Sequence, residues 1–190
     1  PIVINNPLSI EREDIVEAQI QLTSQPNNLS VYDASGNVVP AQILGFKDGV
    51  LDFIFKAKVP SLGYVTYDLR LNDDSSSKLS SNLQITDNSI ENEDYKLTLN
   101  RNGDVTSILD KKQQNKELLK SPIRLSLQSN RPGYWASWEI SWGDVDRNPF
   151  AFVDENVHIS IEEDGPLRST LKITRTKQTS QFVQFISLTS

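Results

Sequence analysis

A stretch rich in tryptophan is the part of this sequence best suited to bind a ligand. All three tryptophans of the chain lie within residues 131–142, RPGYWASWEISW, at spacings i, i+3 and i+7, which a short helix would place on one face. Flat indoles stack on the apolar faces of pyranose rings, and charged side chains beside them hydrogen-bond sugar hydroxyls. The candidate residues close to substrate are Arg131, Trp135, Trp138 and Glu139. The alternative is that the tryptophans are buried as a hydrophobic plug, either against a β-sandwich of this chain or against a domain that this sequence lacks, because clustered tryptophans are usually buried.

Two clusters of acidic residues could supply catalytic carboxyl groups. Hydrolysis of a glycosidic bond needs two carboxyl groups, about 5 Å apart for retention of configuration and farther apart for inversion. The clusters are Glu162, Glu163 and Asp164, and Asp73 and Asp74. Both lie in turn or linker contexts, and adjacent residues of a strand point to opposite faces. We therefore expect solvent-exposed charge here and no catalytic residue.

An acidic loop partly matches a calcium-binding pattern. Its possible ligands are Asp144, Asp146, Asn148 and, at the twelfth position, Glu155. Calcium loops of this type need glycine at the sixth position, where this sequence has Pro149. A solvated acidic loop is therefore the preferred interpretation, and no metal site is predicted.

His158 is the only histidine, and the chain has no cysteine. A histidine-based zinc site or a serine triad with a choice of base therefore cannot be assembled. Because Val157 and Ile159 flank it, His158 is expected to be a packed strand residue.

The elements that would position these residues are strands. About six strand candidates separated by turn signals occupy roughly the first 70 residues, which is typical of a small antiparallel sandwich. Residues 15–22 fit both helical and strand spacing, and strand is preferred because the neighbouring segments are strands. Pro40 is expected at an edge or a bulge, since proline cannot donate to a sheet ladder.

A polar stretch separates this sandwich from the rest of the chain. Residues 72–82, NDDSSSKLSSN, form the best linker candidate, so we predict one domain over 1–82 and a second over 83–190. The second domain opens with a β-hairpin in which Asn102-Gly103 forms a two-residue reversal between YKLTLN and VTSILD. One helical turn in KKQQNKELL, the strand IRLSLQ and three further strands follow, with a turn at Gly165-Pro166.

The composition excludes several classes of partner. Nineteen basic and 25 acidic residues give a net charge of −6, which argues against nucleic acid and anionic membranes. No apolar run is long enough to span a bilayer. The chain has no methionine, begins at Pro1 and ends on what reads as an unfinished strand, so we expect a fragment of a longer protein.

Two segments carry a resemblance to a known family. Residues 90–119 combine an Asn-Glu before a strand, the Asn-Gly turn, Asp110-Lys111 and Glu117-Leu118-Leu119, and INNPLSIEREDIVEAQIQL opens the chain. Both are similar to the β-domains of glycoside hydrolase family 38 α-mannosidases. The resemblance implies an all-β fold, namely a small Ig-like sandwich followed by part of a larger galactose-mutarotase-like supersandwich.

The tryptophan stretch also resembles a segment of that family. Relatives often carry Asp-Arg-Pro-x-x-Trp-Asp-Ala-Trp-Asp close to the catalytic cleft, and two of the family acids are replaced here by Asn130 and Ala136. The resemblance implies a noncatalytic region of a retaining α-mannosidase, with α-mannoside glycans as substrate. The zinc and the aspartate nucleophile would belong to an amino-terminal catalytic domain of the same polypeptide. The alternative is an autonomous carbohydrate-binding or structural sandwich module, since fold does not fix function.

Overall fold

The computed structural model describes residues 1–73, 75, 81–135 and 137–190. Contacts divide the chain into two compact units. The first comprises Pro1–Gln84, Glu163–Ser169 and Leu188–Ser190, and the second comprises Ile85–Glu162 and Thr170–Ser187. Most of the predicted linker, residues 72–82, lies outside the described residues.

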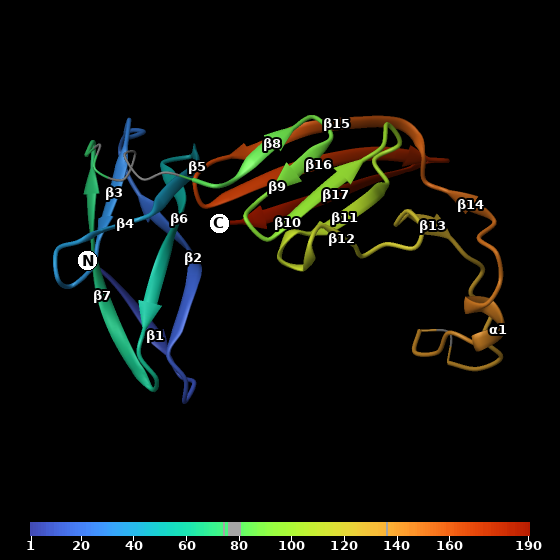
Figure 1. The fold of residues 1–190 in the computed structure, drawn as a ribbon, viewed down its shortest axis with the longest axis horizontal. Helices are drawn as coiled ribbons and strands as arrows, with labels where there is room; N and C mark the ends of the chain where they lie inside the picture. Colours follow the sequence, from blue (N-terminus) through green and yellow to red (C-terminus); the bar gives the residue numbers. More distant parts are fainter. Residues whose placement is uncertain (74, 76–80, 136) are drawn as a thin grey trace. The chain divides into compact units, whose positions relative to one another are not determined.

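The first unit is an antiparallel sandwich, as predicted. In its described part, one sheet has the strand order β1-β7-β3-β4 and the other has the order β2-β6-β5 (Figure 1). The strands are β1 (Ile2–Asn6), β2 (Arg12–Gln21), β3 (Leu29–Tyr32), β4 (Val38–Val39), β5 (Ala41–Lys47), β6 (Val50–Val59) and β7 (Gly63–Leu71). The ambiguous residues 15–22 are confirmed as strand up to Gln21, because β2 pairs with β6 along its whole length. Pro40 lies between β4 and β5, where the chain passes from one sheet to the other.

The two sheets enclose an aromatic core. Phe53, Phe55 and Tyr67 are almost completely buried, and the rings of Phe55 and Tyr67 meet edge to face at 5.1 Å between centroids. The Tyr67 hydroxyl accepts a hydrogen bond from the Lys58 N–H (2.8 Å) and donates one to the Lys58 carbonyl (3.1 Å). Its polar end is therefore satisfied inside the sandwich, and each buried ring contributes about 2 kcal/mol of apolar burial.

The second unit is also built from antiparallel strands, so the all-β prediction holds for both units. Its described strands form the orders β12-β11-β10-β9-β8, β13-β14 and β15-β16-β17 (Figure 1). They are β8 (Gln84–Thr86), β9 (Ser89–Glu91), β10 (Tyr95–Leu99), β11 (Val105–Asp110), β12 (Lys116–Glu117), β13 (Ser126–Leu127), β14 (Ala151–Phe152), β15 (Glu155–Asp164), β16 (Arg168–Lys177) and β17 (Ser180–Thr189).

The hairpin of β10 and β11 is confirmed, but the predicted two-residue turn is wrong. The Asn100 N–H donates to the Asp104 carbonyl (3.0 Å), and the Gly103 N–H donates to the Asn100 carbonyl (2.9 Å), which encloses a three-residue loop. Only Gly103 has positive φ (+74°) in this loop. The Asn100 side chain explains the difference, because its Oδ1 accepts from the N–H groups of Asn102 and Asp104 and closes a wider reversal.

Helical structure is scarce in the second unit. The predicted single turn in KKQQNKELL is present as a 3-10 helix, η2 (Lys111–Gln113), which Asp110 caps. One short α-helix, α1 (Trp142–Val145), follows the tryptophan stretch. None of the helices in the described ranges has the length and apolar character needed to cross a membrane.

Candidate functional site

The tryptophan stretch, residues 131–142 and hereafter the aromatic segment, is exposed on the second unit. The exposed fractions of the side chains are 74% for Trp135, 88% for Trp138 and 76% for Trp142. Tyr134 beside them is 81% exposed. The described residues of the second unit therefore do not bury the indoles, and the plug against the sandwich or against a missing domain stays an untested alternative. Their flat faces are open to a ligand or to another protein surface.

The described residues of the aromatic segment contain a turn after Trp135, and among them only Trp142 lies in a helix, α1, so one helix does not carry all three tryptophans. The N–H groups of Trp138 and Glu139 both donate to the Trp135 carbonyl, at 2.8 and 3.0 Å. Trp135 itself has φ of +58°, in the left-handed region that a helix cannot continue through. Ala136, one of the two positions where relatives carry an acid, lies outside the described residues.

A buried carboxylate joins the two ends of the aromatic segment. Asp144 is 4% exposed, and its Oδ2 accepts hydrogen bonds from the Arg131 N–H (3.0 Å) and the Ser141 hydroxyl (2.8 Å). Arg147 lies 3.4 Å from its other oxygen. The bond from the Arg131 N–H, followed by that from Ser141, lowers the pKa of Asp144 and favours its ionised form. Asp144 is therefore a structural anchor rather than the first ligand of a calcium loop.

The four residues predicted to lie close to substrate all belong to this exposed segment. The structure joins Trp135, Trp138 and Glu139 through the main-chain hydrogen bonds of one turn. Arg131 is connected to the segment's other end through Asp144. The side chains of Arg131 and Glu139 are exposed, and no described contact joins them to each other. That they approach substrate stays a prediction.

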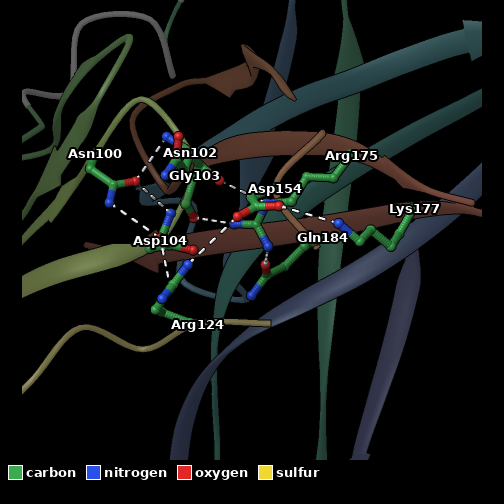
Figure 2. A network of polar contacts seen from close by, with 9 residues as sticks. All are labelled: Asn100, Asn102, Gly103, Asp104, Arg124, Asp154, Arg175, Lys177 and Gln184. Atoms are coloured by element: carbon green, nitrogen blue, oxygen red, sulfur yellow. Dashed lines mark hydrogen bonds and ion pairs between the residues drawn. The ribbon is translucent and has the colours of Figure 1, made fainter. Parts of the chain in front are cut away.

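A second polar cluster, which the sequence did not reveal, surrounds Arg175 of β16. Its guanidinium is 2% exposed and donates from Nε to the Asn102 carbonyl (3.0 Å) and from Nη2 to the Gly103 carbonyl. Nη1 contacts Gln184 Oε1 on β17 at 3.4 Å (Figure 2). Burial is the main influence on the group and lowers the pKa of Arg175.

Charged residues continue this cluster toward solvent. Arg124 lies 3.4 Å from Asp104 and 3.7 Å from Asp154, and Lys177 lies 3.7 Å from the other oxygen of Asp154 (Figure 2). The Arg124 guanidinium also stacks 3.5 Å above the Phe152 ring. Because Asp104 and Asp154 each face a cation and the Arg175 guanidinium has acceptors, we interpret the cluster as one that stabilises the hairpin turn.

The acids that were expected to be solvent-exposed charge are more constrained than predicted. Glu163 is a partly buried bidentate partner of Arg168, with distances of 2.7 and 2.8 Å. Asp73 accepts hydrogen bonds from Ser75 and from the Tyr32 hydroxyl. Glu162 pairs with Lys172 and is exposed, as expected, whereas Asp74 lies outside the described residues. The missed signal for Glu163 was the basic residue Arg168 across the hairpin, and for Asp73 it was the nearby hydroxyl groups of Ser75 and Tyr32.

The donors needed for a metal centre are not assembled in the described ranges. No group of three or more His, Cys, Asp or Glu side chains comes together there. His158 lies on β15, as predicted, but its side chain is exposed rather than packed, because it occupies the solvent face of the strand.

Comparison with known proteins identifies the region to which these features belong. The family model for the glycosyl hydrolases family 38 C-terminal domain matches residues 90–190. This match takes in the hairpin, the aromatic segment and the Arg175 cluster. No curated protein matches the chain.

Two solved structures from Enterococcus faecalis have a similar fold. An alpha-mannosidase from strain V583 shows 14% sequence identity and a TM-score of 0.52, over 91% of this chain and 23% of that chain. A protein in the glycosyl hydrolase family 38 shows 14% identity and a TM-score of 0.50, over 97% of this chain and 28% of that one. This chain thus spans about a quarter of the length of either protein. Since the family match covers more than half of its residues, the chain belongs to glycosyl hydrolase family 38, of which it carries the C-terminal domain region.

Proposed function

We propose that this chain is a noncatalytic supporting region of a retaining α-mannosidase and that its aromatic segment faces the substrate. The observation that carries the proposal is the family 38 C-terminal domain match over residues 90–190, which contains the segment with its exposed indoles. Trp135 and Trp138 would stack on sugar rings, and Arg131 and Glu139 would hydrogen-bond sugar hydroxyls.

The arrangement of acids supports a noncatalytic role. A retaining hydrolase needs two carboxyl groups about 5–5.5 Å apart across the scissile bond. The strongest sequence candidates are engaged in other interactions, since Glu163 binds Arg168 and Asp73 binds Ser75 and Tyr32. In the proposed enzyme, the nucleophile and the zinc that binds sugar hydroxyls belong to an amino-terminal catalytic domain of the same polypeptide.

Hydrolysis of an aryl α-mannoside tests this division of labour. The assay compares the 190-residue chain with the complete product of its gene, both with zinc present. Activity only in the complete product supports the proposal. Activity in the 190 residues alone overturns the noncatalytic role and redirects attention to the acids described above.

Substitutions in the complete product test the role of the aromatic segment. Trp135→Ala and Trp138→Ala should each raise KM by about fivefold, because the loss of one stacking contact costs on the order of 1 kcal/mol. Tyr64→Ala is the matched control, since Tyr64 is an aromatic residue of β7 in the first unit that is also 70% exposed. Unchanged KM in both tryptophan variants would contradict a substrate-facing segment.

A second candidate function is an autonomous carbohydrate-binding module. It is favoured by the accessibility of the indoles in the chain itself, without a partner. Titration of the isolated chain with mannobiose, followed by tryptophan fluorescence, distinguishes the two. Saturable binding that Trp135→Ala abolishes would favour the module, and the absence of binding would favour the supporting region.

A further inference from the structure

Asp144 is an unusual residue in its surroundings because it is buried in an exposed part of the chain. Its side chain is 4% exposed, whereas Trp142 and Val145 of the same short helix are 76% and 45% exposed. A carboxylate in such a place is retained only where its oxygens are satisfied. Both oxygens have partners, with Arg131 N–H and Ser141 Oγ on Oδ2 and Arg147 on Oδ1.

These partners come from opposite ends of the aromatic segment. Arg131 is the first residue of the segment and Ser141 is the residue before its last, so one oxygen atom of Asp144 closes the segment into a loop. Ser141 also caps α1 by accepting from the Asp144 N–H at 3.3 Å, which makes the contact reciprocal. The pairing of β13 with β14 brings the chain on either side of the segment together, and the Asp144 carboxylate joins the segment's own two ends.

The interior of the loop is held in a conformation that its own side chains do not stabilise. Trp135 adopts left-handed φ, which is unfavourable for a bulky residue, and its ring is too exposed for burial to offset this. Such a conformation persists only where the surrounding structure imposes it. In the described residues, the N–H groups of Trp138 and Glu139 constrain the Trp135 carbonyl, and closure of the loop ends by Asp144 adds a constraint from outside that turn.

We infer that Asp144 is the positioning residue of the aromatic segment, holding Trp135 and Trp138 in the orientation that receives a sugar ring. It acts through the loop and does not itself touch the ligand, since its oxygens are occupied and buried. This inference rests on the proposed function of the segment in substrate binding.

The test uses Asp144→Ala and Asp144→Asn in the complete gene product, with Asp146→Asn as control. Asp146 is exposed and follows α1 by one residue, so it differs from Asp144 in lacking these contacts. We expect Asp144→Ala to raise KM for an aryl α-mannoside about tenfold with kcat within twofold, and to change the near-ultraviolet circular dichroism of the tryptophans. Asp144→Asn should show a smaller rise because it keeps one acceptor oxygen, and Asp146→Asn should change neither quantity.

The outcomes separate this role from the proposed function. Unchanged circular dichroism in Asp144→Ala overturns the positioning role. Changed circular dichroism with unchanged KM also overturns it, and the substrate-facing role falls too if both Trp135→Ala and Trp138→Ala leave KM unchanged. If Asp144→Ala fails to fold, Ser141→Ala removes one of the two closing hydrogen bonds and should show the same KM effect at reduced size; no effect on KM there overturns the inference.

Discussion

The guanidinium of Arg175 donates through Nη2 to the main-chain carbonyl of Gly103, 72 positions earlier in the chain. Gly103 lies at the turn of the β10–β11 hairpin, and Arg175 lies inside β16. The contact connects two sheets of the second unit through one buried cation (Figure 2). It also requires glycine at the turn, since a Cβ on Gly103 would lie 2.7 Å from Nη2.

Gly103→Ala should therefore destabilise the second unit for two reasons. Its φ of +74° costs a side chain about 1–2 kcal/mol, and displacement of Ile173 and Arg175 adds an overpacking cost of about 1–3 kcal/mol. Gly36→Ala separates the backbone cost from the overpacking cost, because Gly36 has φ of +82° but an added methyl group there would meet nothing within 4 Å. Urea unfolding of both variants measures the difference, and equal losses of unfolding free energy would refute the close-contact argument.

Arg175→Lys should also destabilise the chain although it keeps the positive charge. A lysine ammonium cannot reproduce the fork that serves the carbonyls of Asn102 and Gly103, and each buried carbonyl left unpaired costs about 1–3 kcal/mol. Arg101→Lys is the control, because Arg101 lies in the same turn and is exposed. Its effect should stay within about 0.5 kcal/mol. Similar unfolding midpoints for the two variants would show that the fork is unimportant.

Gln42 of β5 provides a comparable contact within the first unit. Its Oε1 accepts from the N–H groups of Leu167 and Arg168, at 3.0 and 2.9 Å, and its Nε2 donates to the Arg168 carbonyl at 2.9 Å. Gln42→Ala leaves the buried Leu167 N–H unpaired, so the free energy of unfolding should fall by about 1–3 kcal/mol.

Gln19→Ala is the matched control for Gln42→Ala. Gln19 lies on β2 and is exposed, and its side chain donates a solvent-exposed hydrogen bond to the Asp52 carboxylate. Loss of the Gln19 side chain should therefore cost less than about 0.5 kcal/mol. Hydrogen exchange of the Leu167 and Arg168 amides gives a local readout. Faster exchange is expected in Gln42→Ala alone, and equal exchange rates in both variants would disprove the role of the amide.

Local patterns in the sequence predicted most strands because strand alternation and turn residues act over short distances, but in the predicted strand IRLSLQ only Ser126–Leu127 forms one. The β10–β11 hairpin and the Gly165-Pro166 turn of β15 and β16 followed from a few neighbouring residues. The exact turn at Gly103 did not follow, since it depends on the Asn100 side chain and on the space that Arg175 leaves.

Contacts between distant residues could not be predicted from these patterns. An arginine in the middle of a strand reads as solvent-facing, yet Arg175 is buried because the hairpin turn supplies carbonyl acceptors that only the tertiary fold brings close. The pairing of Glu163 with Arg168 is a local contact across one hairpin, and it was missed because the cross-strand register of that hairpin was not worked out from the sequence. In the aromatic segment, the residue types left burial and a sugar-facing role both open, and Asp144 was expected in a solvated acidic loop, whereas it is buried and accepts a hydrogen bond from the Arg131 N–H.

Asp73 makes the stability of the first unit sensitive to acid. Hydrogen bonds from the Ser75 hydroxyl and N–H, and then from the Tyr32 hydroxyl, lower the pKa of Asp73 from 3.8 to about 2. A carboxyl whose pKa is lower in the folded state stabilises the fold above its unfolded pKa and loses that contribution as protons bind. The stabilisation should therefore be complete above about pH 4 and should disappear between about pH 4 and 2.

Urea unfolding of the wild type and Asp73→Asn from pH 2 to 5 measures this stabilisation as a difference in unfolding free energy that shrinks with falling pH. Tyr32→Phe removes one donor and should reduce the pH dependence without abolishing it, because the Ser75 bonds remain; a difference that stays constant across this range would rule out Asp73 as the titrating group.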